Sequence, residues 1–584
     1  MPSTPKAPIT YRVEARDLQT HLFDITLTIA EPQLQQRVSL PVWIPGSYLV
    51  REFSKQLQHL TAQQGKTRLA ANQLDKCTWQ IDCKPSKPLV LYYQIYAHDN
   101  SVRTAWLDAE RGFFNGTSVC LKVEGQEKSG HWLEVSEPSK TKGWSLATGL
   151  KVEKVNKQGY GTYSADNYDE LVDCPVELGR FWSGTFTASG VPHRFVVAGA
   201  LPGFDGARLI ADAKKICEEE IRFWHGNKKP PFASYLFMLN AVDDGYGGLE
   251  HRNSTALICN RKDLPREGEA KVSEGYTTLR GLISHEYFHT WNVKRLRPTE
   301  FASYDYAKEN YTELLWFFEG FTSYYDDLLL RRADLLDNTG YLKLLNKTIN
   351  QVMQTPGTQV QSVAQASFDA WVKYYRQDEN TPNATVSYYT KGALIALCFD
   401  LTLRREGHTT LDEVMRALWL RCKAGPMREA DFADVLQALG KRSLGTELKS
   451  WIHGKGDLPL RALLEQHGVT VHDDPAQLAQ RLGLRVSEVN GVHIKTVLSG
   501  GAAEKAGFAA GDEWLGIDAI KQQNGWRMQR LDDLLLYAGT AKKVTALVSR
   551  DKRLLRLDLT LPPLATTWRL AIKDAAKVDA WLAK

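Results

Sequence analysis

His285, Glu286 and His289 form the pattern H-E-x-x-H. Side chains of these types at this spacing could bind a metal ion and use it in catalysis. If the segment is helical, the two histidines lie four residues apart and project from the same face. Two imidazoles placed in this way can bind one Zn²⁺, and a glutamate beside the metal can take a proton from water. The alternative is that both histidines are ordinary helix residues. The rest of the chain must therefore supply the other parts of such a site.

Glu319 is the best candidate for a third ligand, because catalytic zinc needs a further protein ligand and one open position. It is the sole charged residue in the aromatic run from Leu314 to Tyr325. A buried, unpaired carboxylate is costly, so its partner should be a metal or an arginine or lysine. We predict that His285, His289 and Glu319 hold one Zn²⁺, with Glu286 as the base. The neighbouring Gly320 would allow close packing of helices there.

Two further segments could complete a site for a peptide. Gly247, Gly248 and Glu250 lie in a glycine-rich stretch, where a strand edge could approach an extended peptide closely; a solvent-exposed hairpin turn is the alternative. Tyr389 stands at the start of an apolar helix. Its hydroxyl could donate a hydrogen bond to a developing oxyanion, or Tyr389 could simply be a packing residue.

The elements that must position these residues indicate a multidomain α+β protein. Alternating and β-branched runs predict an antiparallel β domain over 1–175. Mixed patterns followed by helical ones predict a catalytic domain over 176–470, whose later part is mainly α-helical. A small, mainly β module spans 471–565, and a short amphipathic tail spans 566–584.

The segment 41–53 is unusually rich in aromatic residues and proline for a connection between strands. It could reach the active site, with Tyr48 or Glu52 facing the substrate. We favour the alternative, in which it forms a packed corner of the β domain.

Composition excludes several classes of function. The chain has 43% hydrophobic and 24% charged residues, as an ordinary soluble globular protein does. Its net charge of +5 is small for this length, so nucleic-acid binding is not indicated. No apolar run approaches the length of a membrane span, and no secretory signal is visible. The eight cysteines are scattered without a C-x-x-C pair, which predicts reduced thiols and a cytoplasmic location.

Together, the motifs resemble those of gluzincin aminopeptidases related to aminopeptidase N. The run from Trp316 to Thr322 resembles the W-x-x-E-G-F segment that carries the third zinc ligand. Gly247–His251 resembles the G-x-M-E-N motif, whose glutamate holds the free α-amino group of the substrate. Tyr389–Ala393 resembles the Y-x-K-G-A segment, whose tyrosine stabilises the oxyanion.

The resemblance is closest to the glycyl aminopeptidase family, through the runs His285–Pro298 and Leu40–Phe53 and a PDZ-like tail. That family combines an N-terminal β domain, a thermolysin-like gluzincin catalytic domain and a C-terminal PDZ domain. The resemblance to this family covers about residues 10–565. Two departures stand out: the spacing from His289 to Glu319 is longer than in aminopeptidase N relatives, and His251 replaces the asparagine. Leu482–Leu484 is where a carboxylate-binding loop of the PDZ-like domain would lie.

This resemblance implies a zinc aminopeptidase that acts on peptides with a free N-terminus and prefers glycine or alanine as first residue. Glu250 would bind the α-ammonium group, and Tyr389 would stabilise the oxyanion. The PDZ-like domain could bind the C-terminus of a peptide. Two alternatives remain: an endopeptidase that captures protein substrates through its PDZ domain, and a PDZ adaptor without catalytic activity.

Overall fold

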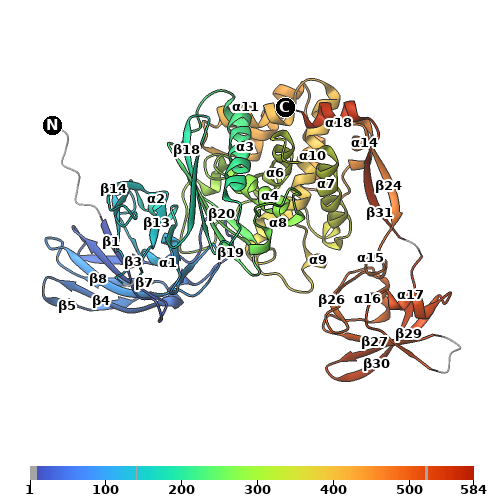
Figure 1. Ribbon diagram of the computed structural model, residues 1–584, viewed down its shortest axis with the longest axis horizontal. Coiled ribbons are helices and arrows are strands. Elements are labelled where there is room, and N and C mark those ends of the chain that lie inside the picture. Colours follow the sequence, from blue (N-terminus) through green and yellow to red (C-terminus); the bar gives the residue numbers. More distant parts are fainter. Residues whose placement is uncertain (1–8, 140, 520–523, 564, 584) are drawn as a thin grey trace. The chain divides into compact units, whose positions relative to one another are not determined.

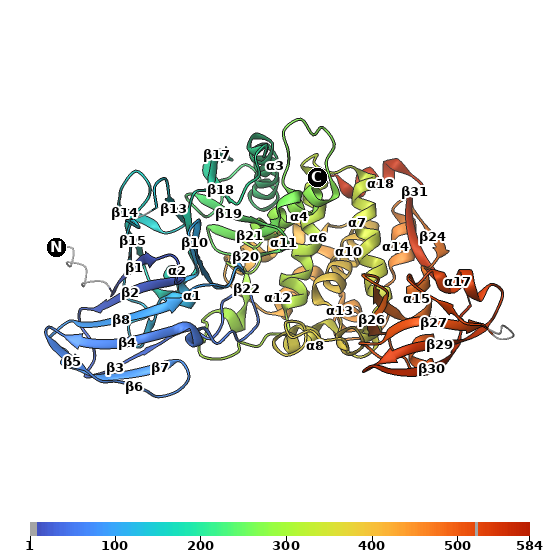
Figure 2. The same cartoon turned by 60° about the horizontal axis from the view of Figure 1, so that its bottom comes forward.

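The computed structural model describes residues 9–139, 141–519, 524–563 and 565–583. The chain forms two compact units, drawn in Figures 1 and 2. Unit 1 comprises Met1–Asn310 and Trp419–Met427, and unit 2 comprises Tyr311–Leu418 and Arg428–Lys584. The predicted domain boundaries after 175, 470 and 565 stay a prediction.

Unit 1 begins with an eight-stranded sheet in the order β14-β15-β12-β1-β2-β8-β4-β5. Buried and more exposed residues alternate along β2 and β8, because one face of each strand packs into the apolar core and the other does not. Most pairs are antiparallel, as predicted, but β1 and β12 pair in parallel. The strands of this sheet are β1 (Ile9–Asp17), β2 (Leu22–Ile29), β4 (Leu57–Gln64), β5 (Thr67–Leu69), β8 (Leu89–Tyr96), β12 (His131–Val135), β14 (Lys151–Val155) and β15 (Gly161–Ala165).

Two four-stranded sheets complete the N-terminal β domain, in the orders β13-β16-β10-β9 and β11-β3-β7-β6. Their strands are β3 (Gln35–Ser39), β6 (Ala71–Gln73), β7 (Thr78–Asp82), β9 (Ala105–Leu107), β10 (Arg111–Phe114), β11 (Lys122–Val123), β13 (Ser145–Thr148) and β16 (Val176–Gly179). Short helices lie between the strands: η1 (Phe53–Gln56), α1 (Gly116–Val119) and α2 (Tyr168–Val172).

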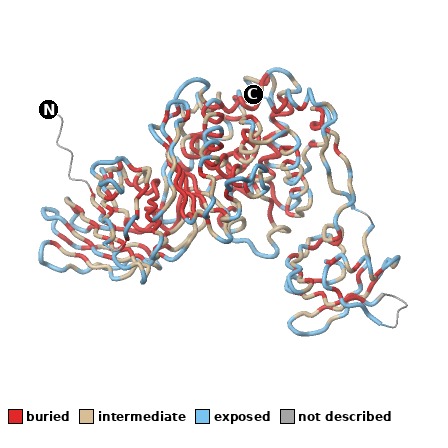
Figure 3. Tube along the Cα trace, viewed as in Figure 1, coloured by how far each residue is buried: buried red, intermediate tan, exposed pale blue. Residues whose placement is uncertain are grey.

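A five-stranded mixed sheet follows in unit 1, in the order β17-β18-β19-β21-β20, so that β20 is an edge strand. Helix α3 packs on β17, and α4 packs on β20 and β21. The central strands of this sheet are largely buried (Figure 3). Its elements are β17 (Trp182–Ala188), β18 (Val191–Ala198), α3 (Gly206–His225), β19 (Tyr235–Val242), β20 (Gly247–Glu250), β21 (Ser254–Asn260), η2 (Arg261–Asp263) and α4 (Glu274–Phe288). The short elements β22 (Arg297–Pro298), η3 (Thr299–Phe301) and β23 (Pro426–Met427) complete unit 1.

Unit 2 begins with a helical part, as predicted. The single helix expected from about Thr312 to Asp334 is divided at Glu319 into α5 (Leu315–Phe318) and α6 (Gly320–Arg332). The other helices are α7 (Asn338–Met353), η4 (Pro356–Gln359), α8 (Val363–Phe368), η5 (Asp369–Trp371), α9 (Thr381–Ala384), α10 (Tyr388–Glu406), α11 (Leu411–Arg421), α12 (Glu429–Gly440), α13 (Gly445–Trp451) and α14 (Leu460–Gln466). Helix α11 runs past Leu418, the last residue of this segment of unit 2.

The predicted close approach of helices at Gly320 is confirmed. A Cβ atom added at Gly320 would lie 2.5 Å from Cα of Gly392 in α10, and one added at Gly392 would lie 2.5 Å from the carbonyl oxygen of Trp316. No residue with a side chain fits at either position without a shift of backbone. These two glycines therefore set the approach of Glu319 to the start of α10.

The C-terminal part of unit 2 has its own apolar core. Its sheet has the order β25-β26-β27-β29-β30, with β28 paired to β27, and the predicted strands at 492–498, 514–518 and 543–548 correspond to β26, β27 and β29. The elements are α15 (Leu478–Leu482), β25 (Leu484–Ser487), β26 (Val492–Val497), α16 (Ala502–Ala506), β27 (Glu513–Ala519), β28 (Trp526–Arg527), α17 (Asp533–Ala538), β29 (Lys543–Arg550) and β30 (Arg553–Thr560). The antiparallel pair β24 (Val469–Pro475) and β31 (Thr566–Ile572), followed by α18 (Ala575–Leu582), completes the chain.

Across the described residues, none of the helices has both the length and the apolar composition that crossing a membrane requires.

Candidate active site

Helix α4 carries the H-E-x-x-H residues, as the sequence predicted. Its N-terminus is fixed by Ser273, whose side chain accepts a hydrogen bond from the backbone N–H of Tyr276. The helix ends at Phe288, but His289 keeps helical dihedral angles as the capping residue, and its N–H donates to the carbonyl of His285. Because the backbone stays helical through His289, both histidines project from one face.

The two imidazoles have the arrangement that a shared metal ion requires. Their Nε2 atoms are 3.1 Å apart, and two nitrogens bound tetrahedrally to one zinc lie about 3.3 Å apart. Nδ1 of His289 lies 2.7 Å from the carbonyl oxygen of Asn292. A carbonyl only accepts, so Nδ1 carries the proton and Nε2 presents its lone pair. The donor chemistry of unit 1 therefore fits zinc.

His285, His289 and Glu319 are a group of side chains that could hold a metal ion, each offering one ligand atom. The histidines belong to unit 1 and Glu319 to unit 2. Two imidazoles and one carboxylate are a known ligand set for catalytic zinc.

Gly248 on β20 lies directly against Glu286. A Cβ atom added at Gly248 would be 2.1 Å from Oε1 of Glu286, so a larger residue there would displace that buried carboxylate. Strand β20 is thus the edge strand that the glycine-rich sequence allowed, rather than an exposed hairpin turn. The carbonyl oxygen of Gly248 accepts a hydrogen bond of 3.2 Å from Nη2 of Arg103.

Glu250 lies two residues further along the same strand and is 4% exposed. Its Oε1 has no hydrogen-bond partner among the described residues. A buried carboxylate oxygen of this kind is costly unless a cation or donor binds it. The backbone of Gly46 covers the same group, since a Cβ atom there would lie 2.5 Å from either carboxylate oxygen.

The segment 41–53 is the packed corner that we favoured, but its tip reaches Glu250 through Gly46. Tyr48 is buried and stacks on Phe301, with ring centroids 5.8 Å apart. Glu52 instead pairs with Lys76 at 2.7 Å.

In unit 2, Tyr389 lies in the first turn of α10, which begins after the capping residue Ser387. Burial raises the pKa of Tyr389 well above its usual 10.0, and the charge of Glu319 raises it further. The hydroxyl therefore stays protonated and able to donate. The Oη atoms of Tyr389 and Tyr375 are 3.3 Å apart, so a second hydroxyl accompanies it. The Tyr389 ring also stacks on Tyr388 and Tyr374.

Comparison with known proteins identifies the family. The chain matches the Peptidase M61 N-terminal domain over residues 10–180 and M61 glycyl aminopeptidase over residues 278–395. It is 37% identical to an aminopeptidase N family protein from Idiomarina loihiensis, with a TM-score of 0.93, and the similarity covers 99% of this chain and 100% of that one. The chain belongs to the M61 glycyl aminopeptidase family. The prediction of a zinc aminopeptidase of the gluzincin type is thereby confirmed.

More distant structures share less with the chain. An M1 zinc metallopeptidase from Deinococcus radiodurans is 15% identical, with a TM-score of 0.47, over 78% of this chain and 95% of that one. Aminopeptidase A from Legionella pneumophila, in complex with aspartic acid, is 11% identical with a TM-score of 0.47, over 96% of this chain and 58% of that one. Among the curated proteins, none matches.

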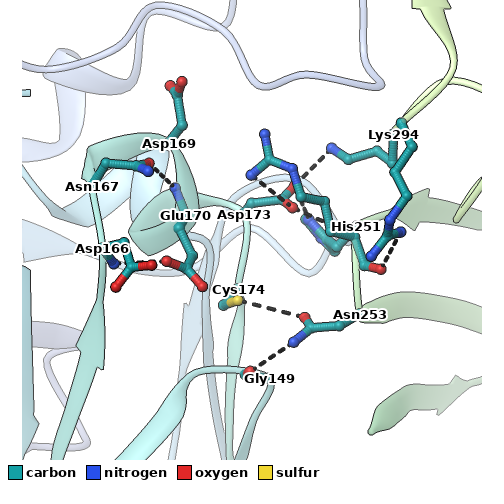
Figure 4. Close-up of polar contacts among 12 residues, drawn as sticks. Gly149, Asp166, Asn167, Asp169, Glu170, Asp173, Cys174, His251, Asn253 and Lys294 are labelled. Atoms are coloured by element: carbon teal, nitrogen blue, oxygen red, sulfur yellow. Dashed lines mark hydrogen bonds and ion pairs between the residues drawn. The ribbon is translucent and has the colours of Figure 1, made fainter. Parts of the chain in front are cut away.

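In this M61 chain, His251 stands where the G-x-M-E-N motif has asparagine, and its side chain has a partner of its own. It is buried, and its Nδ1 lies 3.3 Å from Oδ1 of Asp173 (Figure 4). Lys294 forms an ion pair of 2.6 Å with the same oxygen, and the backbone N–H of Arg252 donates to Oδ2. Burial raises the pKa of Asp173, but the charges of Lys294 and Arg252 outweigh it and hold that pKa well below its usual 3.8.

Asp173 therefore joins three segments that the sequence separates widely. Asp173 follows α2, His251 follows β20, and Lys294 follows α4. The backbone N–H of Lys294 donates to the carbonyl of His289. Sequence reasoning missed Asp173, Arg103 and Gly46. Lys294 lies within the run His285–Pro298 that carries the family resemblance, but no pattern in the sequence connects it with Asp173.

Proposed function

We propose that this enzyme hydrolyses the first peptide bond of peptides with a free N-terminus, with a preference for glycine or alanine as first residue. The observation that carries the proposal is the arrangement of one edge strand in unit 1. Gly248 lies against the carboxylate of Glu286, and Glu250, two residues on, presents a buried carboxylate oxygen without a partner in the described chain. A peptide that pairs with Gly247 and Gly248 would place its α-ammonium group near Glu250.

The proposed mechanism assigns a separate task to each residue. His285, His289 and Glu319 would hold one zinc ion, which would polarise the scissile carbonyl and lower the pKa of the attacking water. Glu286 takes the proton of that water and passes it to the leaving amine. Tyr389 donates a hydrogen bond to the oxygen that becomes negative. Glu250 binds the α-ammonium group and so restricts cleavage to the first bond.

The preference for small first residues rests on the crowding around Glu250. Gly46 lies against the carboxylate on one side, and Glu250 itself is almost fully buried. Little space is left beside a bound α-amino group for a long first side chain.

We further propose that residues 471–565 form a PDZ-like domain that binds the C-terminus of a peptide. Support comes from its separate core and from the position of Leu482–Leu484, where Gly483 in a left-handed conformation joins α15 to β25. A cytoplasmic location is also proposed, since all eight cysteines are free thiols and seven are buried.

One comparison tests the proposed reaction. The enzyme should release glycine from Gly-Ala-Ala-Phe, and mass spectrometry should show only stepwise shortening from the N-terminus. The N-acetylated peptide should be cleaved at least about a hundredfold more slowly, because it has no ammonium group for Glu250. Internal cleavage of both peptides at equal rates would instead establish an endopeptidase, and no cleavage by the zinc-loaded protein would favour the adaptor.

A further inference from the structure

A large cavity lies within unit 2, and none of the residues assigned to hydrolysis lines it. Its volume is about 900 Å³, in the range of ligand sites in proteins. The end of α7, the start of α10, α15 and the loop after β26 form it, and their labels can be followed in Figure 2. Its walls are largely apolar and include Val352, Val360, Leu394, Leu458, Leu498 and Trp568.

Lys391 lines this cavity and is the unusual feature of its wall. It is 2% exposed, and its Nζ has no hydrogen-bond partner among the described residues. Burial lowers the pKa of Lys391, while the charge of Asp457 raises it only in part. Asp457, also in the wall, is exposed to solvent and forms no ion pair with Lys391 within the described chain. An ammonium group buried without a counter-charge is costly unless an anion binds there.

The opposite end of the cavity is formed by the proposed PDZ-like domain. Gly483, Leu498 and Gly501 contribute to it, together with Arg481, whose Nε also has no hydrogen-bond partner among the described residues. Asn383 fixes this loop to the helical part: its Nδ2 donates to the carbonyl of Val497 at 2.9 Å, and its Oδ1 accepts from the N–H of Ser499 at 2.9 Å. These two hydrogen bonds hold the loop after β26 against the helical part at this end of the cavity.

Lys391 and Tyr389 lie two residues apart on α10, so their side chains leave the helix about 200° apart. The lysine thus faces away from the side of α10 that presents the oxyanion donor. A ligand on Lys391 would occupy a site separate from the one that holds the scissile bond.

We infer that this cavity binds the free C-terminal carboxylate of a peptide, with Lys391 as its counter-charge and an apolar last side chain packed against the walls. The inference rests on the proposed binding of a peptide C-terminus and locates it. A carboxylate suits one buried ammonium group with a second cationic side chain, Arg481, nearby. An apolar last residue suits the walls, and Asp457 at the exposed margin would disfavour ligands with a higher negative charge.

The test uses the full-length Glu286→Gln protein, so that no peptide is consumed. Binding of N-acetyl-Ala-Ala-Val-Leu, as the free acid and as the C-terminal amide, is measured by calorimetry. The acid should bind at least about tenfold more tightly than the amide, because only the acid pairs with Lys391. Lys391→Met should weaken binding of the acid about 10- to 100-fold and leave the amide unchanged. The exposed Lys455→Met, two residues from Asp457, is the matched control and should change neither.

Two further measurements keep the inference refutable. Lys391→Met should unfold at the same or a higher temperature than the parent, because an unpaired buried charge has been removed. Asp457→Asn, at an exposed position, should tighten binding of the acid a few-fold. If neither peptide binds, binding of a C-terminus fails as a whole. If the acid binds equally to the Lys391→Met protein, C-terminus binding stands and the site at Lys391 is refuted. Equal competition by decanoate would refute a peptide-specific site.

Discussion

Replacing Tyr389 with phenylalanine should lower kcat about a hundred- to a thousandfold and change KM little. In the proposed mechanism the hydroxyl acts only when negative charge develops on the carbonyl oxygen. Loss of one such donor costs about 2.7–4 kcal/mol of transition-state stabilisation. The phenylalanine ring can keep the stacking on Tyr388 and Tyr374, whose centroids lie 4.9 and 5.4 Å from that of Tyr389. The protein should therefore remain folded, and the loss should be catalytic.

The assay is steady-state hydrolysis of glycine and alanine p-nitroanilides, with zinc content and unfolding temperature measured on the same samples. Tyr375→Phe is the matched control. It removes a neutral hydroxyl 3.3 Å from that of Tyr389, which is worth about 0.5–1.5 kcal/mol, or less than about fifteenfold in rate. A fall of less than fivefold in Tyr389→Phe, or an effect confined to KM, would refute the role of Tyr389.

Three further predictions concern Glu250, Asp173 and Gly392. Glu250→Gln should lower kcat/KM for Gly-p-nitroanilide about 10- to 150-fold, because a charge-assisted hydrogen bond to the ammonium group is lost. The slow cleavage of the acetylated substrate should not change. An equal loss on both substrates would contradict ammonium binding by Glu250. Asp173→Asn should lower the free energy of unfolding in urea by about 3–5 kcal/mol, since it leaves the buried Lys294 unpaired. The control is Asp334→Asn, at an exposed carboxylate that pairs with Arg331. It should lower the free energy of unfolding by less than about 1 kcal/mol. Gly392→Ala should lower the free energy of unfolding by about 1–3 kcal/mol, because the added methyl group overpacks against Trp316 and Gly320. The control is Gly130→Ala, where a Cβ atom would meet nothing within 4 Å. Equal stability of the two variants would contradict the tight contact.

The pH dependence of stability follows from the same buried charge. The folded-state pKa of Asp173 lies well below its usual 3.8, so the unfolded state binds the proton more readily than the folded state. Its contribution to stability is complete above the unfolded pKa and is lost as the pH falls through the folded value. The buried tyrosines, whose pKa values are raised, act in the opposite direction: their contribution is lost above about pH 10.

Local patterns in the sequence predicted much of the fold. Alternation of apolar residues located β2, and β-branched and aromatic residues located β8. Helical spacing located α3, the H-E-x-x-H segment located α4, and an apolar run located α10. The glycine beside Glu319 indicated a close helix contact, because glycine has no side chain to hold two helices apart. Patterns of this kind depend on neighbours within a few residues.

Contacts between distant segments could not be predicted in the same way. The parallel pairing of β1 with β12 joins strands that more than a hundred residues separate, so no hairpin signal marks it. Gly46 against Glu250, and Asp173 against Lys294, depend on how whole sheets and helices pack. The sequence analysis assigned no role to Lys391, and only the structure shows that it is buried beside a cavity without a hydrogen-bond partner among the described residues.

The most direct test of the proposed chemistry is Glu286→Gln. The amide keeps the shape that fits against Gly248 and leaves His285 and His289 in place, so zinc content should stay at one ion per chain. Hydrolysis of Gly- and Ala-p-nitroanilide should fall by about 10²- to 10⁴-fold, because no group remains to take the proton of the attacking water. Zinc content measured by atomic absorption and turnover measured on the same sample decide the matter. A zinc-loaded Glu286→Gln protein with near wild-type activity would contradict the account.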